Sequence, residues 1–198
     1  VSLFESLPSA EFEEGCSEMI KYGMIMDPIL LKGLLERPAA LKASDADLVE
    51  IVKICVELKA SVVLEDEFDQ GLRQLLNYGH TLGHALEQVS GYQISHGRGV
   101  ATGMLVFLKI AVRQGRLAPE AVEKFARLLH TYHLLPERYN YSTELLQAAM
   151  LKDKKRRSQT ITIVLPSEFG RCELKELPIE IFMNVFEEEW LAYGQATS

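Results

Sequence analysis

Residues 77–97 read NYGHTLGHALEQVSGYQISHG, and they place three histidines among four glycines and several apolar residues. His80 and His84 are four residues apart, and His96 follows His80 by sixteen residues. Burying a polar side chain without a hydrogen-bonding partner costs about 1–3 kcal/mol. We therefore expect each imidazole to have a partner, which is a metal ion, a substrate or another of the polar side chains.

The segment around these histidines has the period of an α-helix. We predict one continuous helix over residues 68–90, which ends at Gly91. On that helix the polar side chains share one narrow arc: Arg73, Asn77, His80, His84 and Glu87. Because a surface helix usually has a broad polar face, a narrow one indicates a cleft. Gly79 and Gly83 flank the histidines and would let a backbone or a ligand come close.

The histidine spacing alone leaves the chemistry open. The zinc-protease motif HExxH needs a Glu directly after its first His, and Thr81 occupies that position here, which excludes a protease. A single His on an apolar helix is more often a hydrogen-bonded core residue than a metal ligand. A zinc site would also use a carboxylate, and Glu18 is a candidate. Its spacing from Glu14 and Lys21, however, favours a solvated helix face with a weak ion pair.

Helical periodicity dominates the rest of the chain, and the fold class is predicted to be mainly α. Further helices are expected over residues 9–22, 28–36, 45–64, 97–115, 119–133, 142–151 and 178–193. Ser44 and Asp47 resemble a capping box for the third of these. The run 97–115 is nearly all apolar, which predicts a central helix. TITIVLP at 160–166 and RCELKELP at 171–178 predict a small β-hairpin near 160–175.

Composition narrows the class of protein. The chain has 198 residues, 47% of them hydrophobic, which is enough for one sizeable core. Its net charge of -7 argues against nucleic-acid binding. No apolar run reaches the roughly 18 residues that a membrane span needs, and the first residues lack the pattern of a secretory signal. Three widely spaced cysteines predict reduced thiols in a cytoplasmic protein: Cys16, Cys55 and Cys172.

Five sequence blocks carry a resemblance to a known family. In chain order they are CSEMIKYGMIMDP, ICVELKASVV, GLRQLLNYGHTLGHALE, ISHGRGVATGM and MLKDKKRRSQTITIVLP. They resemble, between about Glu14 and Pro166, the mainly helical carboxy-terminal half of 3-dehydroquinate synthase. The resemblance implies that residues 1–198 form one metal- and substrate-binding domain. It also implies that NAD is bound mainly by an amino-terminal half outside this chain. Residues 1–198 themselves contain no GxGxxG turn.

The resemblance implies a role for each of a set of polar residues. The metal ligands would be Glu18, His80 and His96, and the metal would be Zn²⁺ or Co²⁺. His84 would transfer protons near the substrate phosphate, with assistance from Asp69. The substrate-binding residues would be Lys21, Lys59, Arg73, Asn77 and Lys154, or its neighbour Lys155 in place of the last.

The implied activity is conversion of 3-deoxy-D-arabino-heptulosonate 7-phosphate to 3-dehydroquinate and phosphate in the shikimate pathway. We expect a small sugar phosphate as the partner, no nucleic acid and no membrane, with a homodimer left open. The chain alone is expected to be inactive.

Two departures from the family pattern leave alternatives open. Asp69 stands where the family usually has Glu, and Arg98 follows His96-Gly97 where the family commonly has an acidic residue. Another sugar phosphate cyclase, such as a 2-deoxy-scyllo-inosose synthase, is therefore one alternative. An NAD-dependent polyol dehydrogenase is a second, although its first ligand is typically Asp and not Glu. A non-catalytic helical interaction domain is a third.

Overall fold

The computed structural model describes residues 4–68, 71–135, 139, 141–151 and 159–195. Within them it is mainly helical with one two-stranded hairpin, which confirms the predicted fold class. The helical elements are η1 (Phe4–Ser6), α1 (Ser9–Met26), α2 (Pro28–Glu36), α3 (Leu48–Glu65), η2 (Leu72–Asn77), α4 (His80–Val89), α5 (His96–Arg113), α6 (Glu120–Thr131), α7 (Thr143–Leu151) and α8 (Ile179–Gln195). The strands are β1 (Thr160–Glu168) and β2 (Arg171–Pro178).

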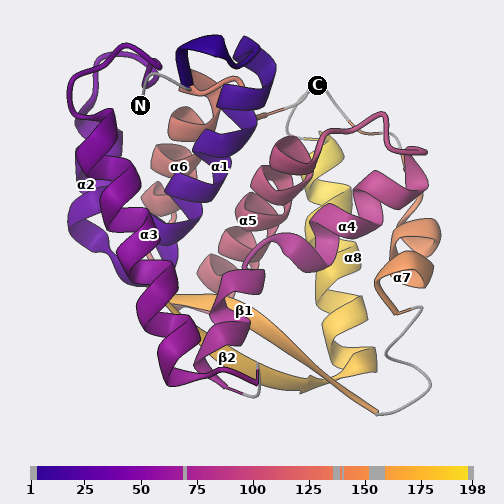
Figure 1. Ribbon diagram of the computed structural model, residues 1–198. Coiled ribbons are helices and arrows are strands. Elements are labelled where there is room, and N and C mark those ends of the chain that lie inside the picture. Colours follow the sequence, from indigo (N-terminus) through magenta and orange to yellow (C-terminus); the bar gives the residue numbers. More distant parts are fainter. Residues whose placement is uncertain (1–3, 69–70, 136–138, 140, 152–158, 196–198) are drawn as a thin grey trace.

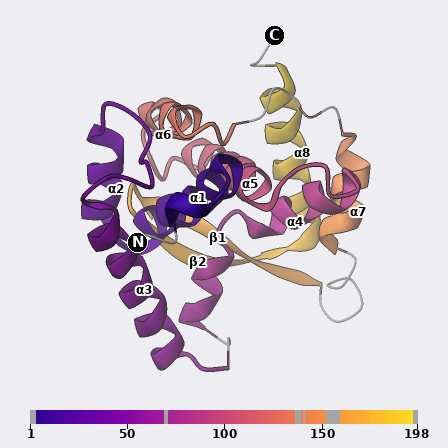
Figure 2. The ribbon, with the colours of Figure 1, turned by 45° about the horizontal axis from the view of Figure 1, so that its top comes forward.

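Helix α5 is the centre of the molecule, as its apolar sequence predicted. It packs against α1, α4, α6, α8 and β1, and Figures 1 and 2 show it surrounded by them. Nearly every residue from Gly97 to Ala111 is buried. None of the helices in the described part of the chain has the length and apolar character to cross a membrane.

The predicted hairpin is present and crosses one end of the helical bundle (Figure 1). Its strands pair antiparallel, from Thr160 opposite Pro178 to Glu168 opposite Arg171. The side chains of Ile161, Ile163 and Leu165 are buried beneath the helices. Alternate residues of a strand point to opposite faces, which explains how one face of so short a sheet joins the core.

The capping box predicted at Ser44 is wrong. Helix α3 begins at Leu48, and its N-cap residue Asp47 makes no side-chain cap hydrogen bond. Asp45 and Asp47 instead form ion pairs with Arg37, just beyond the end of α2. The Asp47 side chain, which the local pattern assigned to the helix end, is therefore paired with Arg37 instead.

The continuous helix predicted over residues 68–90 is also wrong. The chain forms the short 3-10 helix η2, leaves helical geometry at Tyr78, and starts α4 only after Gly79. Gly79 has φ of +80°, which glycine adopts without steric cost. Tyr78 is fully buried, and its hydroxyl donates to the Met104 carbonyl at 2.8 Å. Packing against α5 thus breaks a helix that the periodicity would have continued.

Candidate metal centre

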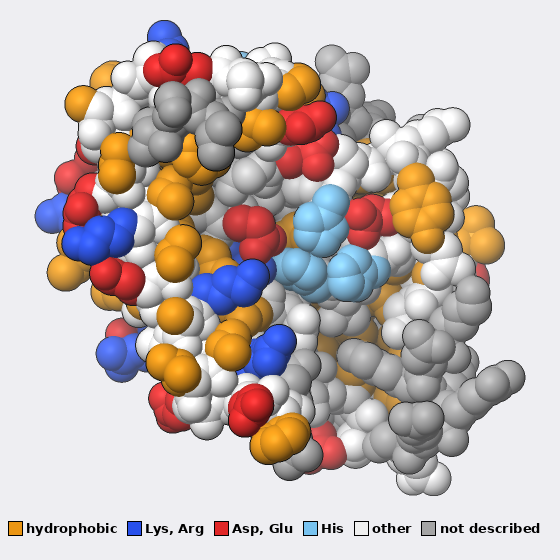
Figure 3. Space-filling view, in the orientation of Figure 1, with side chains coloured by type: hydrophobic (Ala, Val, Ile, Leu, Met, Phe, Trp, Pro, Cys, Tyr) orange, Lys and Arg blue, Asp and Glu red, His pale blue; other side chains and the backbone are white. Residues whose placement is uncertain are grey.

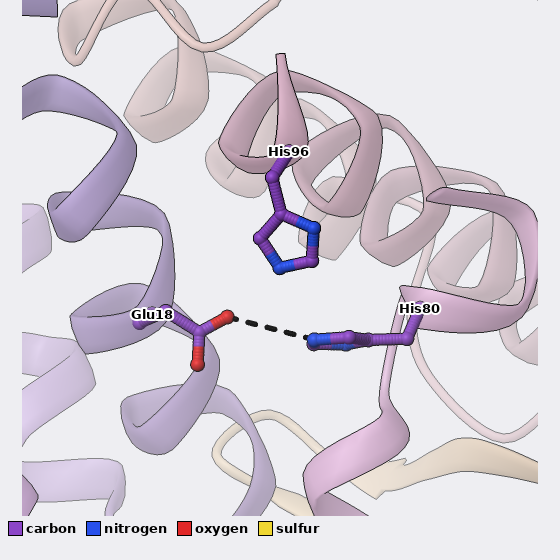
Figure 4. A group of neighbouring side chains, drawn as sticks. All are labelled: Glu18, His80 and His96. Atoms are coloured by element: carbon purple, nitrogen blue, oxygen red, sulfur yellow. Dashed lines mark ion pairs between the residues drawn. The ribbon is translucent and has the colours of Figure 1, made fainter. Parts of the chain in front are cut away.

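Glu18, His80 and His96 come from three helices and point toward one another (Figure 4). Glu18 lies within α1, whereas His80 and His96 are the first residues of α4 and α5. One carboxylate oxygen and one nitrogen of each ring lie within 4.8 Å of one another. Around a tetrahedral zinc ion with bonds of about 2.1 Å, ligand atoms lie about 3.4 Å apart. A small inward movement would therefore give these side chains the spacing of a metal site.

Glycine contacts set the positions of the helices that carry these residues. A Cβ atom on Gly103 would lie 2.0 Å from the Gly79 carbonyl oxygen, directly before His80. A Cβ atom on Gly97, directly after His96, would lie 2.7 Å from the Cα atom of Glu14 on α1. Both distances are shorter than any real Cβ contact. Helix α5 thus meets α4 and α1 backbone to backbone beside the candidate ligands, as predicted for Gly79.

The His80 ring is oriented by the backbone before it. Its Nδ1 atom lies 3.2 Å from the Tyr78 carbonyl oxygen. Because a carbonyl oxygen can only accept, Nδ1 carries the proton and Nε2 keeps its lone pair. Nε2 lies 3.7 Å from Oε1 of Glu18, the contact that is dashed in Figure 4. The atom that faces the carboxylate is therefore the one that can bind a metal.

His80 is neutral at physiological pH. Burial, together with the positive charge of Lys21, lowers its pKa from the usual 6.5 to about 4, although Glu18 acts in the opposite direction. Metal ions bind the neutral imidazole. Protons would thus not compete with a metal for His80 until the solution is distinctly acidic.

The solvated ion pair predicted from the Glu18–Lys21 spacing is wrong, because the Lys21 side chain is buried. Lys21 is 3% exposed, and its Nζ atom donates to Oε2 of Glu18 at 2.6 Å. Burial lowers the pKa of Lys21, and the ion pair with Glu18 partly offsets that effect. Lys21 therefore neutralises only one oxygen of the carboxylate.

The second oxygen of Glu18 fits a bound cation. Oε1 is buried and has no hydrogen-bond partner among the described residues. An unpaired buried acceptor of this kind costs about 1–3 kcal/mol, and here it faces the free nitrogen of a neutral imidazole. A divalent cation would satisfy both atoms, so the residues present fit a zinc or cobalt ion.

The remaining candidate residues surround the three ligands. Figure 3 shows a group of His side chains at the middle of one face, with acidic and basic side chains beside it. The ring of His84 is exposed, and its centroid lies 5.4 Å from that of His80 and 5.8 Å from that of His96. Lys59 is exposed on α3, and its charge contributes to the lowered pKa of Lys21.

Arg73 and Asn77 lie on η2 and not on the helix of the histidines, so the predicted single polar arc does not exist. Arg73 donates through Nη1 to the Glu67 carbonyl at 3.1 Å. Asn77 is exposed at the end of the same element. Asp69, Lys154 and Lys155 lie outside the described residues.

Two contacts at this site were not assigned by the sequence reasoning. The carboxylate of Glu87 lies 3.2 Å from Nδ1 of His96, although Glu87 had been placed only as part of a polar arc. The sequence did offer one signal for Glu87. It lies three residues after His84, and residues at that spacing share a helix face, so Glu87 could have been placed beside the histidines. The Tyr78 carbonyl that orients His80 left no signal, since every residue has a carbonyl.

Solved structures with the same fold are sugar phosphate cyclases. The 2-epi-5-epi-valiolone synthase of Streptomyces hygroscopicus, solved with NAD⁺ and Zn²⁺ bound, aligns with a TM-score of 0.85 at 18% identity, covering 96% of this chain and 53% of that one. A 2-deoxy-scyllo-inosose synthase, complexed with carbaglucose-6-phosphate, NAD⁺ and Co²⁺, aligns with a TM-score of 0.74 at 22% identity, covering 92% and 52%. At these identities the likeness shows the fold alone.

Sequence comparison gives the family. Residues 15–156 match the family model described as 3-dehydroquinate synthase C-terminal, and the chain belongs to that family. The 3-dehydroquinate synthase of Pseudoalteromonas translucida is 41% identical over 172 residues, 85% of this chain and 48% of that protein. The enzyme of the same name from Syntrophotalea carbinolica is 36% identical over 192 residues, which cover 95% of this chain and 53% of that protein. The chain thus spans about half the length of these relatives.

Proposed function

We propose that residues 1–198 form the metal- and substrate-binding domain of a 3-dehydroquinate synthase. The complete enzyme would convert 3-deoxy-D-arabino-heptulosonate 7-phosphate to 3-dehydroquinate and phosphate, with NAD bound mainly by an amino-terminal half. The observation that carries this proposal is the meeting of Glu18, His80 and His96 in a chain of this family. The rest of the site is consistent with an anionic substrate.

In this proposal the metal, Zn²⁺ or Co²⁺, is held by Oε1 of Glu18 and one ring nitrogen each of His80 and His96. Three protein ligands leave coordination positions open for substrate oxygens. When bound, the ion supplies Lewis-acid polarisation of the substrate hydroxyl groups. Lys21 holds the other oxygen of Glu18 at 2.6 Å, which directs a single oxygen of the carboxylate toward the histidines.

The cationic side chains near this centre would bind the carboxylate and phosphate of the substrate. Arg73 offers a planar guanidinium that can contact an anion through two N–H groups, and Lys59 offers a point charge. Asn77 would hydrogen-bond substrate oxygens from the same element as Arg73. Lys154 is proposed as a further anion contact.

His84 is proposed to hold and release the proton that moves when phosphate leaves. Its ring is exposed on α4 and lies close to both candidate metal histidines. A general acid or base must reach the reacting group directly or through one water molecule, and an exposed side chain beside the metal centre meets that need. Asp69 is proposed to assist this transfer.

Arg98 favours a second candidate function. It is exposed on α5, two residues after His96. A cation there changes the field around substrate bound beside the metal, and it would suit a phosphate placed differently from that of the seven-carbon substrate. A cyclase that acts on a hexose phosphate is therefore the alternative substrate class.

The substrate can be tested by joining residues 1–198 to the amino-terminal half of the Pseudoalteromonas translucida enzyme. Phosphate release is measured with NAD⁺ and Zn²⁺ from the seven-carbon acid phosphate and from glucose 6-phosphate. We expect release from the seven-carbon substrate alone. Release from glucose 6-phosphate alone would assign the second candidate function. The unjoined chain should release no phosphate from either, since NAD is expected to bind elsewhere.

A further inference from the structure

The carboxylate of Glu87 contacts His96 but belongs to none of the roles described above. We infer that Glu87 is a positioning residue, which holds the His96 ring in the tautomer and orientation that a metal ion needs. This inference rests on the proposed metal centre. It concerns a residue that would act through His96 and would not itself touch the ion.

The loop between α4 and α5 is built so that His96 returns to Glu87. The Glu87 carbonyl accepts from the Ser90 hydroxyl at 2.9 Å and from the Tyr92 amide at 2.8 Å. The Ser90 hydroxyl in turn accepts from the Ile94 amide at 3.1 Å. These bonds use only the backbone of Glu87. Substituting its side chain should therefore leave the loop intact and change the contact with His96 alone.

His96 needs such a contact more than His80 does. The His80 side chain is 15% exposed and its Nδ1 atom faces a backbone carbonyl, so packing and backbone fix its ring. The His96 side chain is 43% exposed, and burial cannot fix it to the same degree. Its Nδ1 atom lies 3.2 Å from Oε1 of Glu87, whose own side chain is only 17% exposed.

The chemistry of this contact favours metal binding through the other nitrogen. An ionised carboxylate only accepts hydrogen bonds, so Nδ1 of His96 carries the proton, and in the neutral imidazole Nε2 then keeps its lone pair. A carboxylate on the outer nitrogen also makes an imidazole a better donor to metal, and removing such a partner typically weakens metal affinity 10- to 100-fold. The two histidines thus receive matching support, from a carbonyl at His80 and from Glu87 at His96.

Glu87 could instead be a ligand, because His84, Glu87 and His96 also bring donor atoms within 4.8 Å of one another. A cation held there would take the Glu87 carboxylate away from His96. The geometry favours Glu18, His80 and His96 as the metal ligands. Glu18 contributes a buried oxygen without a partner, whereas His84 is exposed and Glu87 already has His96 as its partner.

The experiment compares zinc affinity in Glu87→Ala and Glu87→Gln with a matched control, Glu13→Ala. Glu13 makes the same kind of contact, 3.0 Å from Nδ1 of His133, but neither residue belongs to the metal centre. Affinity is measured by competition with a chromophoric chelator. We expect Glu87→Ala to bind zinc about 10- to 100-fold more weakly. Glu87→Gln, whose amide oxygen still accepts from Nδ1, should lose less, and Glu13→Ala should match the parent chain.

A second measurement reads the His96 tautomer by long-range ¹H–¹⁵N correlations in the zinc-free chain. We expect the proton on Nδ1 in the parent chain and in Glu87→Gln, and a mixture of tautomers in Glu87→Ala. An unchanged tautomer in Glu87→Ala would overturn the inference even if zinc did not bind. A parent chain that binds two zinc ions, one of them lost in Glu87→Ala, would make Glu87 a ligand and also overturn it. Failure of the parent chain to bind zinc would refute the metal centre and leave the tautomer result to decide the inference.

Discussion

Substitution of Gly103 by Ala should damage both the packing of α4 on α5 and the proposed metal centre. The added Cβ would lie 2.0 Å from the Gly79 carbonyl oxygen, whereas real Cβ atoms essentially never come closer than 3.0 Å. The two backbones must therefore separate by about 1 Å. His80 directly follows Gly79, so it would move away from His96 by a similar amount. Metal–ligand distances tolerate only about 0.2 Å.

Two quantities should change in Gly103→Ala. Overpacking of a core typically costs about 1–3 kcal/mol, and we expect the free energy of unfolding of the metal-free chain to fall by about that amount in urea titrations. Zinc should also bind more weakly, because the trio of ligands no longer closes. Gly33→Ala is the matched control, since Gly33 is also helical but has no atom within 4 Å of an added Cβ.

Gly33→Ala should leave zinc affinity unchanged and raise the free energy of unfolding by about 0.5–1 kcal/mol, because Ala is the better helix former. The reasoning would be refuted if Gly103→Ala unfolded and bound zinc as the parent chain does. A loss of stability with unchanged zinc affinity would show that the α4–α5 contact supports the fold but does not place His80.

Three further predictions concern the same site. Glu18→Gln should abolish tight zinc binding. It should also destabilise the chain, because the buried Lys21 ammonium loses its countercharge. Adding Lys21→Met should restore the midpoint of urea unfolding but not zinc binding. The pKa of His80 is about 4 in the folded chain and 6.5 in the unfolded chain, so between these values the unfolded chain binds more protons. The free energy of unfolding of the metal-free chain should therefore fall as pH falls from 6.5 to 4, by up to about 3 kcal/mol. Urea titrations should show a smaller fall in His80→Gln. Tyr78→Phe removes a 2.8 Å hydrogen bond to the Met104 carbonyl and should lower the free energy of unfolding by about 0.5–1.5 kcal/mol; an unchanged value would mean that this bond does not anchor the start of α4.

The elements with strong periodicity could be predicted from the sequence alone. The apolar run 97–115 predicted a central helix because such a segment is stable only when it is buried on all sides, and α5 is that helix. The alternation in TITIVLP predicted a strand for a similar local reason, and β1 confirms it. These features depend on which residues follow one another, and so a linear pattern records them.

The break before His80 could not be predicted in this way. Gly79 within an apolar helical pattern is tolerated by the helix at a cost of about 1 kcal/mol, so the pattern alone favoured continuation. The helix is interrupted because Gly79 contacts Gly103 and because Tyr78 is buried. Both effects depend on α5, which comes later in the chain. The burial of Lys21 escaped prediction for the same reason, since α1 packs against elements from distant parts of the chain.

The candidate ligands themselves were proposed from the resemblance of five sequence blocks to a known family, whereas their geometry depends on residues without side chains. Gly97 lets α5 meet α1 beside His96, and Gly103 lets α5 meet α4 beside His80. Helices that meet at glycine are held by backbone contact, which leaves little room for either partner to slide. A site made from the ends of two helices and the side of a third is only as exact as those contacts. Replacing these glycines while keeping the histidines would therefore preserve the sequence motif but move the candidate ligands apart.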